Sequence, residues 1–160
     1  MRKLSDTGLC WSWLVLLVVI IDRATKGLML HFFHLYETTR VTSFFNLTLT
    51  YNRGAAFSFL NSAGGWQSKL FGIVATAISL VLLGWLLRLR KTQRWTGVAV
   101  AMVLGGALGN LSDRLTYGHV IDFIQLHVSH FYWPVFNIAD SAICIGAFML
   151  IFEAIIFKKR

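Results

Sequence analysis

The chain has 160 residues, 56% of them hydrophobic, and a mean hydropathy of +0.64. A composition this apolar excludes an ordinary soluble domain, and the short length favours a single integral membrane domain over residues 1–160. The formal net charge of +8 is not accompanied by a basic face with interleaved stacking aromatic residues, so we expect no nucleic-acid partner.

Four hydrophobic segments are long enough to cross a bilayer as helices. They cover residues 9–29, 67–87, 95–112 and 136–157. The first is unusual because it runs directly into Asp22, Arg23 and Lys26, at a depth where lipid would otherwise be expected. The sequence therefore predicts a mainly α-helical membrane protein built as a bundle of four transmembrane helices.

The basic residues predict the orientation of this bundle. Nine of the fifteen lie near the chain ends or in the connection after the second helix, namely Arg2, Lys3, Arg88, Arg90, Lys91, Arg94, Lys158, Lys159 and Arg160. Four spans place these regions on one side, which the positive-inside rule assigns to the cytoplasm. We therefore expect both termini in the cytoplasm and the connections 31–66 and 114–135 on the outer side.

The first outer connection contains a predicted strand. In "FNLTLTYN", residues 45–52, apolar and polar side chains alternate, as in a half-buried strand. Backbone of this kind cannot face lipid, so we expect it to pair with residues 41–44 or 120–124 in a small outer sheet. The stretch "NSAGGW" at 61–66 predicts the turn into the second helix, with Trp66 as an interface anchor.

Several polar residues near the helices have a structural explanation. Asp22 and Lys26 are four positions apart, so they can neutralise each other on one helix face. Asp113 and Arg114, with Asn110 one turn earlier, are expected to act as a supporting interface anchor at the outer end of the third helix. Residues 105–109 form a G-x-x-x-G spacing that predicts close helix packing.

Asp122 and Asp140 are embedded in apolar sequence without a basic neighbour. The first follows the third helix and the second opens the fourth, so two packed helices could bring them together. Two carboxylates in a low-dielectric site cannot both ionise easily and therefore share a proton, which is the arrangement of an aspartic protease. The alternative is that Asp140 caps the fourth helix and Asp122 is merely exposed.

Five motifs in order resemble those of the bacterial lipoprotein signal peptidases, also called signal peptidase II. They are "DRATK" at 22–26, "YNRGAAF" at 51–57, "GGALGNLSDR" at 105–114, "VIDF" at 120–123 and "FNIADSA" at 136–142. The resemblance covers nearly the whole chain.

The resemblance implies an intramembrane aspartic endopeptidase of the bacterial inner membrane, with Asp122 and Asp140 as the catalytic pair near the outer face. It would remove the signal peptide from a prolipoprotein, cutting just before the diacylglyceryl-modified cysteine. The residues expected to line or support the site are Asn52, Gly54, Asn110, Asp113, Arg114, Asn137, Asp22 and Lys26. The outer strand and the 53–65 loop would cover the substrate.

The resemblance further implies that two carboxylates and water suffice, so no cofactor is expected. We also expect no metal site, because the histidine pairs at 31/34 and 127/130 have no carboxylate in ligand spacing. The enzyme is expected to act as a monomer, with membrane lipid and lipid-modified prolipoproteins as its partners. Two other functions remain open, a small proton- or ion-translocating protein and a noncatalytic assembly partner.

Overall fold

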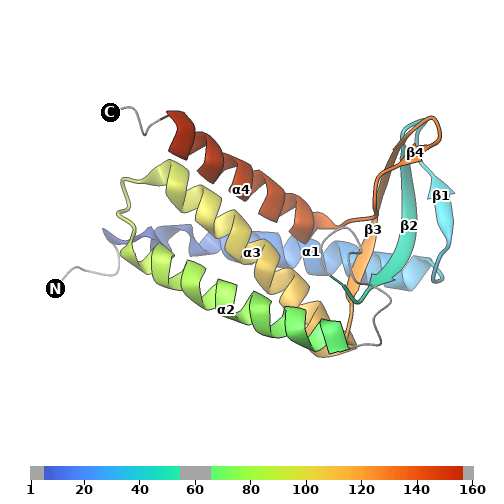
Figure 1. Ribbon diagram of the computed structural model, residues 1–160, viewed down its shortest axis with the longest axis horizontal. Coiled ribbons are helices and arrows are strands. Elements are labelled where there is room, and N and C mark those ends of the chain that lie inside the picture. The colour runs from blue at the N-terminus through green and yellow to red at the C-terminus, as the bar shows by residue number, and fades with distance from the viewer. Residues whose placement is uncertain (1–5, 55–65, 157–160) are drawn as a thin grey trace.

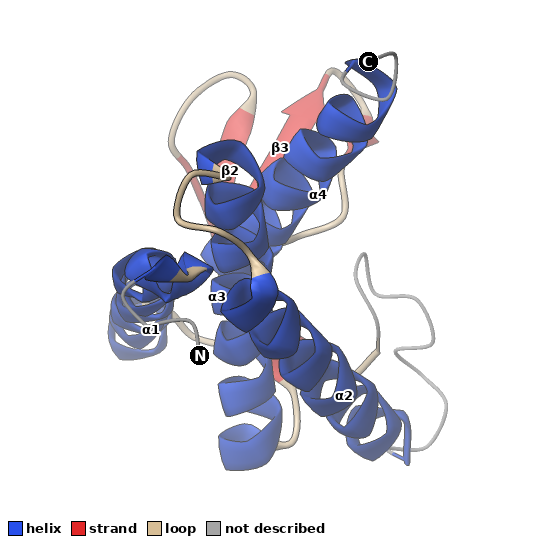
Figure 2. Cartoon of the chain, turned by 90° about the vertical axis from the view of Figure 1, so that its left-hand side faces the viewer, coloured by secondary structure: helices blue, strands red, loops and turns tan. Residues whose placement is uncertain are grey.

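A computed structural model describes residues 6–54 and 66–156. A short 3-10 helix, η2 (Gly8–Trp11), leads into α1 (Ser12–Phe32). Three further helices follow, α2 (Trp66–Arg88), α3 (Arg94–Tyr117) and α4 (Ile138–Ile156). Helix α3 packs against the other three helices and forms the centre of the bundle (Figures 1 and 2).

Three of the helices, α2, α3 and α4, are long and apolar enough to cross a membrane. Helix α1 has 21 residues, but it carries Asp22, Arg23 and Lys26 in its second half. Within the described residues, length and composition therefore support three spans directly. The predicted mainly helical membrane architecture is confirmed, whereas membrane crossing by α1 stays a prediction.

Helix α3 continues five residues beyond its predicted end at residue 112, to Tyr117. It ends at Gly118, whose φ of 73° lies in the left-handed region that glycine adopts without strain. The predicted end of the third helix before Asp113 is therefore wrong, although Arg114 still lies in the last turn of α3. Asp113 is fully buried and bonded within the protein, so its charge does not interrupt the helix and does not anchor it at the interface.

Four antiparallel strands form a sheet at one end of the bundle (Figure 1). They are β1 (Thr38–Arg40), β2 (Phe45–Asn52), β3 (Val120–Val128) and β4 (Phe131–Tyr132), in the order β1-β2-β3-β4. The predicted strand and its pairing with residues 120–124 are confirmed. Its other neighbour is β1 rather than residues 41–44, which make the turn between β1 and β2.

The alternation predicted for β2 is interrupted by a bulge. Leu47 is paired with Ile124 and Thr50 with Asp122, so three steps along β2 match two along β3. Residues opposite each other in a sheet project from the same face. The extra residue therefore turns Asn52 onto the face of Asp122, where strict alternation would have placed it on the opposite face.

Small residues let the helices approach closely, as the G-x-x-x-G spacing predicted. A Cβ on Gly105 would lie 2.8 Å from the Cβ of Val18 in α1. Gly106 abuts the carbonyl of Ala139 in α4. Glycines on α3 thus bring α1 and α4 against it, close to the start of α4.

Candidate active site

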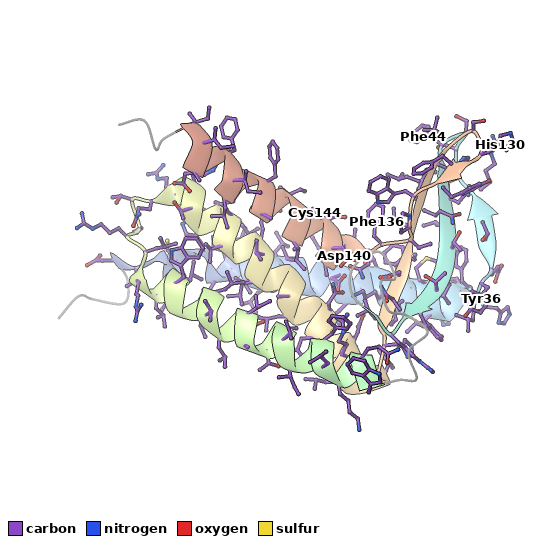
Figure 3. All side chains as sticks on the ribbon, in the orientation of Figure 1. Tyr36, Phe44, His130, Phe136, Asp140 and Cys144 are labelled. Atoms are coloured by element: carbon purple, nitrogen blue, oxygen red, sulfur yellow. The ribbon has the colours of Figure 1, made fainter. Side chains whose placement is uncertain are left out.

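The first turn of α4 carries one of the two candidate catalytic aspartates. Asn137 precedes the helix, and its side-chain oxygen accepts the backbone N–H of Asp140 at 2.9 Å. In return, Asp140 Oδ2 accepts the backbone N–H of Asn137 at 3.2 Å. This reciprocal arrangement is a capping box, so the capping interpretation of Asp140 is correct. It also fixes the direction of the carboxylate, at the end of α4 beside the sheet (Figure 3).

Asp122 lies on β3 and is only 1% exposed, so the alternative of an exposed residue is wrong. Its Oδ1 accepts the side-chain N–H of Asn137 at 2.7 Å, and its Oδ2 accepts that of Asn52 at 3.0 Å. Asn137 therefore contacts both candidate aspartates and brings the two carboxyl groups into one site. The bulge in β2 supplies the second contact by directing Asn52 to this face.

Amides hold all four carboxylate oxygens of this pair. The remaining oxygen, Asp140 Oδ1, accepts the side-chain N–H of Asn110 at 2.8 Å. The orientation of each amide follows from a neighbour that can only donate. The oxygen of Asn52 accepts the Gly54 N–H at 2.9 Å, and the oxygen of Asn110 accepts Lys26 Nζ at 3.0 Å. The amide nitrogens must therefore point at the carboxylates.

A second group of charged side chains lies behind the pair, between α1 and α3. Lys26 Nζ lies 2.8 Å from Asp22 Oδ2 and 2.7 Å from Asp113 Oδ2, and all three side chains are buried. Arg23 adds a contact of 2.9 Å to Asp113 Oδ1. The predicted pairing of Asp22 with Lys26 is confirmed, but Lys26 serves two carboxylates and Asn110. We call Asp22, Arg23, Lys26 and Asp113 the ion network.

The ion network also binds the backbone next to each candidate aspartate. Asp22 Oδ1 accepts the N–H of Ala139 at 2.9 Å, one residue before Asp140. Asp113 Oδ2 accepts the N–H of Ile121 at 3.2 Å, one residue before Asp122. Lys26 contacts both Asp22 and Asp113. A single cation therefore connects the two carboxylates that hold the backbone next to Asp140 and Asp122.

The surroundings of Asp122 favour its protonated form. Burial raises the pKa of Asp122 to about 7, and the neighbouring charge of Asp140 acts in the same direction. The amide hydrogen bonds from Asn52 and Asn137 oppose this rise but do not cancel it. At neutral pH, Asp122 can therefore donate a proton.

A cavity of about 310 Å³ opens beside the pair, between α2, α3 and α4. Asp140, Asn52, Asn110 and Arg114 provide its polar end. Its other walls are apolar and include Phe71, Val74, Ala75, Ile78, Val103, Ala107, Val120 and Ile143. The arrangement suits a long apolar ligand with one polar bond to be presented to the carboxylates.

Arg114 stands at the rim of this cavity. Its guanidinium donates to the carbonyl of Gly54 at 2.8 Å and lies 5.9 Å from the centre of the Phe71 ring. Gly54 belongs to the predicted 53–65 cover, and the following residues, 55–65, lie outside the described part of the chain. The motif residues 55–57, the turn at 61–65 and the covering role of the 53–65 loop are therefore untested.

All the predicted site residues lie at the same end of the bundle, either around the pair or in the ion network. Sequence reasoning missed Arg23 as a partner of Asp113 and Phe71 as a wall of the cavity. The sequence shows Arg23 only as a charge in the first helix, with no sign of its distant partner. No local pattern distinguishes Phe71 from the other apolar residues of α2. Within the described residues, no group of three or more His, Cys, Asp or Glu side chains is arranged to hold a metal ion.

Two solved structures of bacterial membrane enzymes are similar to this chain. A solved bacterial membrane enzyme, determined by the in meso method at 2.3 Å resolution, superposes with a TM-score of 0.83. It is 29% identical, and the alignment covers 97% of this chain and 92% of that one. A second bacterial membrane enzyme, determined at 1.9 Å, gives a TM-score of 0.79 at 28% identity, covering 95% and 97% of the two chains. The fold is therefore that of a bacterial membrane enzyme.

Sequence comparison identifies the family. Residues 14–156 match the family described as signal peptidase (SPase) II. The lipoprotein signal peptidase of Photorhabdus laumondii is 48% identical over 96% of this chain and 92% of its own length. That of Pseudomonas putida is 49% identical over 94% and 90%. The chain belongs to the signal peptidase II family, as its motifs indicated.

Proposed function

We propose that Asp122 and Asp140 are the catalytic pair of this peptidase, which removes signal peptides from prolipoproteins. Family membership and near-full-length similarity to lipoprotein signal peptidases support the activity. The assignment of the pair rests on one observation above all. Asn137 bonds to both carboxyl groups, and one of them, that of Asp140, lines the polar end of a cavity whose other walls are apolar.

In the proposed reaction the pair carries one proton. Asp140, ionised and lining the cavity, takes a proton from a water molecule as the water oxygen attacks the scissile carbonyl carbon. Asp122, neutral, gives its proton to the carbonyl oxygen, which yields a tetrahedral diol. When the C–N bond breaks, the leaving nitrogen receives the proton from Asp140, and a diol hydroxyl returns a proton to Asp122. The pair is thereby restored without a metal or organic cofactor.

The remaining residues support this chemistry in different ways. Three amide side chains orient the carboxyl groups by hydrogen bonds, those of Asn52, Asn110 and Asn137. Three charged side chains hold the backbone next to the catalytic pair, those of Asp22, Lys26 and Asp113. Arg114 and Gly54 form the rim next to the substrate bond. We assign to Arg114 the positioning of the loop carbonyl of Gly54 or of the substrate backbone.

The apolar cavity suits a substrate that is itself a lipid-bearing membrane helix. Apolar residues of α2 line one side, and the carboxylate of Asp140 lies at the polar end. A bond next to a diacylglyceryl-modified cysteine would place the acyl chains in lipid and the scissile carbonyl at the pair. We therefore propose cleavage just before that cysteine.

We propose that residues 1–160 form one domain that acts as a monomer in the bacterial inner membrane. Helix α1 would be the fourth span, since Asp22 and Lys26 are buried against α3 instead of facing lipid, and Arg23 is paired with Asp113. Both termini would lie in the cytoplasm, because η2, the α2–α3 connection and the end of α4 share the bundle end opposite the sheet (Figure 1). The active site would then lie near the outer face.

The decisive experiment compares cleavage of a diacylglyceryl-modified prolipoprotein by purified wild type, Asp122→Asn and Asp140→Asn. Each variant keeps the size of the side chain but removes its acid, so we expect a loss of about 10³-fold or more. Asp6→Asn makes the same change at an exposed site outside the cavity and serves as control. Thermal unfolding of each variant verifies folding. A variant that is folded and cleaves at the normal rate would refute the pair.

Ion translocation has less support from the distribution of charge. The buried charged groups lie toward the sheet end, and at the other end Glu153 accepts a hydrogen bond from Thr96 at 2.7 Å. Proton flux in reconstituted vesicles tests this alternative. A sustained flux that Asp122→Asn abolishes would favour it.

A further inference from the structure

The end of the bundle opposite the active site carries a cleft that the peptidase reaction does not use. The cleft has a volume of about 870 Å³. It lies between η2, the first residues of α1 and the connection between α2 and α3. Its lining residues include three cationic side chains, Arg90, Lys91 and Arg94, and one carboxylate, Asp6.

Backbone bonds hold the cleft in shape. The N–H of Gly8 donates to the carbonyl of Leu89 at 3.1 Å, and the N–H of Lys91 donates to the carbonyl of Asp6 at 3.1 Å. These two bonds form an antiparallel bridge between Thr7 and Arg90 and attach the start of the described chain to the α2–α3 connection. The three cationic side chains thus project from a fixed backbone rather than from a free terminus.

The cationic groups of the cleft have no ionic partner in the part of the chain that the structure describes. Among the described residues, no carboxylate lies within 4.0 Å of Arg90, Lys91 or Arg94; the three ion pairs all belong to the ion network. The start of α3 adds positive character, because Gln93 makes no side-chain cap and instead accepts the N–H of Arg90 at 2.8 Å. The cleft therefore favours an anion with several acceptor oxygens, such as a phosphate group.

An apolar surface begins at the edge of the cleft. Trp13 lines the cleft and is 55% exposed. Leu16, Leu17 and Ile20 follow it at helical spacing and are also exposed. A phosphate held by the cleft would have apolar chains running along this face of α1. The soluble alternative, a free phosphorylated compound, would make no use of it.

We propose that this cleft binds the phosphate headgroup of an anionic phospholipid, whose acyl chains lie along the exposed face of α1. The site is separate from the catalytic pair and lies at the other end of the bundle. Trp13 is placed as tryptophan is at a membrane interface, and the basic groups are placed to attract an anionic leaflet. The bound lipid would fix the start of α1 against the α2–α3 connection.

Lipid retention by purified full-length protein in detergent tests the proposal. Native mass spectrometry would compare phosphatidylglycerol with phosphatidylcholine of the same acyl chains. We expect at least tenfold tighter retention of phosphatidylglycerol by wild type, and loss of that preference in Arg90→Gln/Arg94→Gln. The matched control, Arg40→Gln/Lys69→Gln, removes the same charge from exposed sites elsewhere and should keep the preference.

Three results would overturn the proposal. Equal retention of the two lipids would mean that the cleft does not select a headgroup. An equal loss in the control variant would mean that net charge alone attracts the lipid. Complete displacement of phosphatidylglycerol by millimolar glycerol phosphate would identify a soluble phosphate as the ligand. Prolipoprotein cleavage by the cleft variant, measured in detergent, should stay within about twofold of wild type, so this test is independent of the catalytic pair.

Discussion

Two pairs of aspartates lie at the sheet end of the bundle, and their neighbours differ in kind. Asp22 and Asp113 contact Lys26 directly, and Asp113 also contacts Arg23. Asp122 and Asp140, in contrast, accept hydrogen bonds from amide groups. A carboxylate in direct contact with a cation has its charge balanced inside the protein and can act as an anchor. A carboxylate held by neutral amides can still exchange a proton.

The largest expected effect on stability comes from breaking the paired group. Lys26→Met keeps most of the side-chain volume but leaves Asp22 without a cation and Asp113 with Arg23 alone. Removing one partner of a buried ion pair costs about 3–5 kcal/mol, so we expect a large fall in Tm, measured by thermal unfolding in detergent.

A charge-balanced variant provides the control for this change. Lys26→Met/Asp22→Asn removes the carboxylate that has lost its cation, and the amide oxygen introduced at position 22 can still accept the N–H of Ala139. It should therefore recover part of the lost stability. If Lys26→Met unfolds at the temperature of wild type, the ion network is not the anchor that the contacts indicate.

The pH dependence of cleavage tests the catalytic pair, as the stability of Lys26→Met tests the ion network. Because the pKa of Asp122 is raised to about 7, its proton is lost as the pH rises through 7. We expect kcat/KM to fall about tenfold for each pH unit above that value. A flat profile between pH 7 and 9 would contradict the shared proton.

The same raised pKa has a consequence for stability. A carboxyl group whose pKa is higher in the folded than in the unfolded state destabilises the fold as pH rises from about 4 to 7. Asp122→Asn has no such group. The Tm of Asp122→Asn minus the Tm of wild type should therefore rise between pH 4 and 7. The altered hydrogen bond adds a constant to this difference and does not change its direction.

The smallest expected effect is that of Arg114, which supports the rim and not the proton transfer. Arg114→Ala should slow cleavage about tenfold through lost positioning while the protein remains folded. Arg114→Lys keeps the charge but not the planar guanidinium that reaches the Gly54 carbonyl. Its cleavage rate should therefore lie between those of Arg114→Ala and wild type. Unchanged turnover of Arg114→Ala would refute the positioning role.

Much of the fold could be predicted because hydrophobic segments and one alternating strand have clear periods. The end of α3 could not, because Asp113 and Arg114 were interpreted as the edge of the membrane. Charge marks such an edge only when it faces water, and Asp113 is paired with residues 87 and 90 positions earlier in the chain. Contacts of that range leave no local signal in the sequence.

The candidate site could also be predicted only in part. From spacing alone, Asp122 and Asp140 could be either a dyad or a cap plus an exposed residue, and the structure combines a cap with a buried neighbour. The motifs supplied the asparagines, but not their directions. Those depend on which oxygen meets Lys26 Nζ or the Gly54 N–H, which only the folded chain determines.

The bulge in β2 also constrains how the chain can change in length. Deleting one residue between Leu47 and Thr50 would restore regular pairing with β3 and leave Asn52 opposite Val120, on the face of Asp122. Deleting two residues there would shift the pairing by one position and turn Asn52 to the opposite face, although no active-site residue had been altered. An insertion at the turn after Val128, where Ser129 already has a φ of 53°, would leave that pairing as it is. Changes of length should therefore be tolerated at the tip of the sheet, whereas before Asn52 the only tolerated deletion should be one that removes the bulge alone.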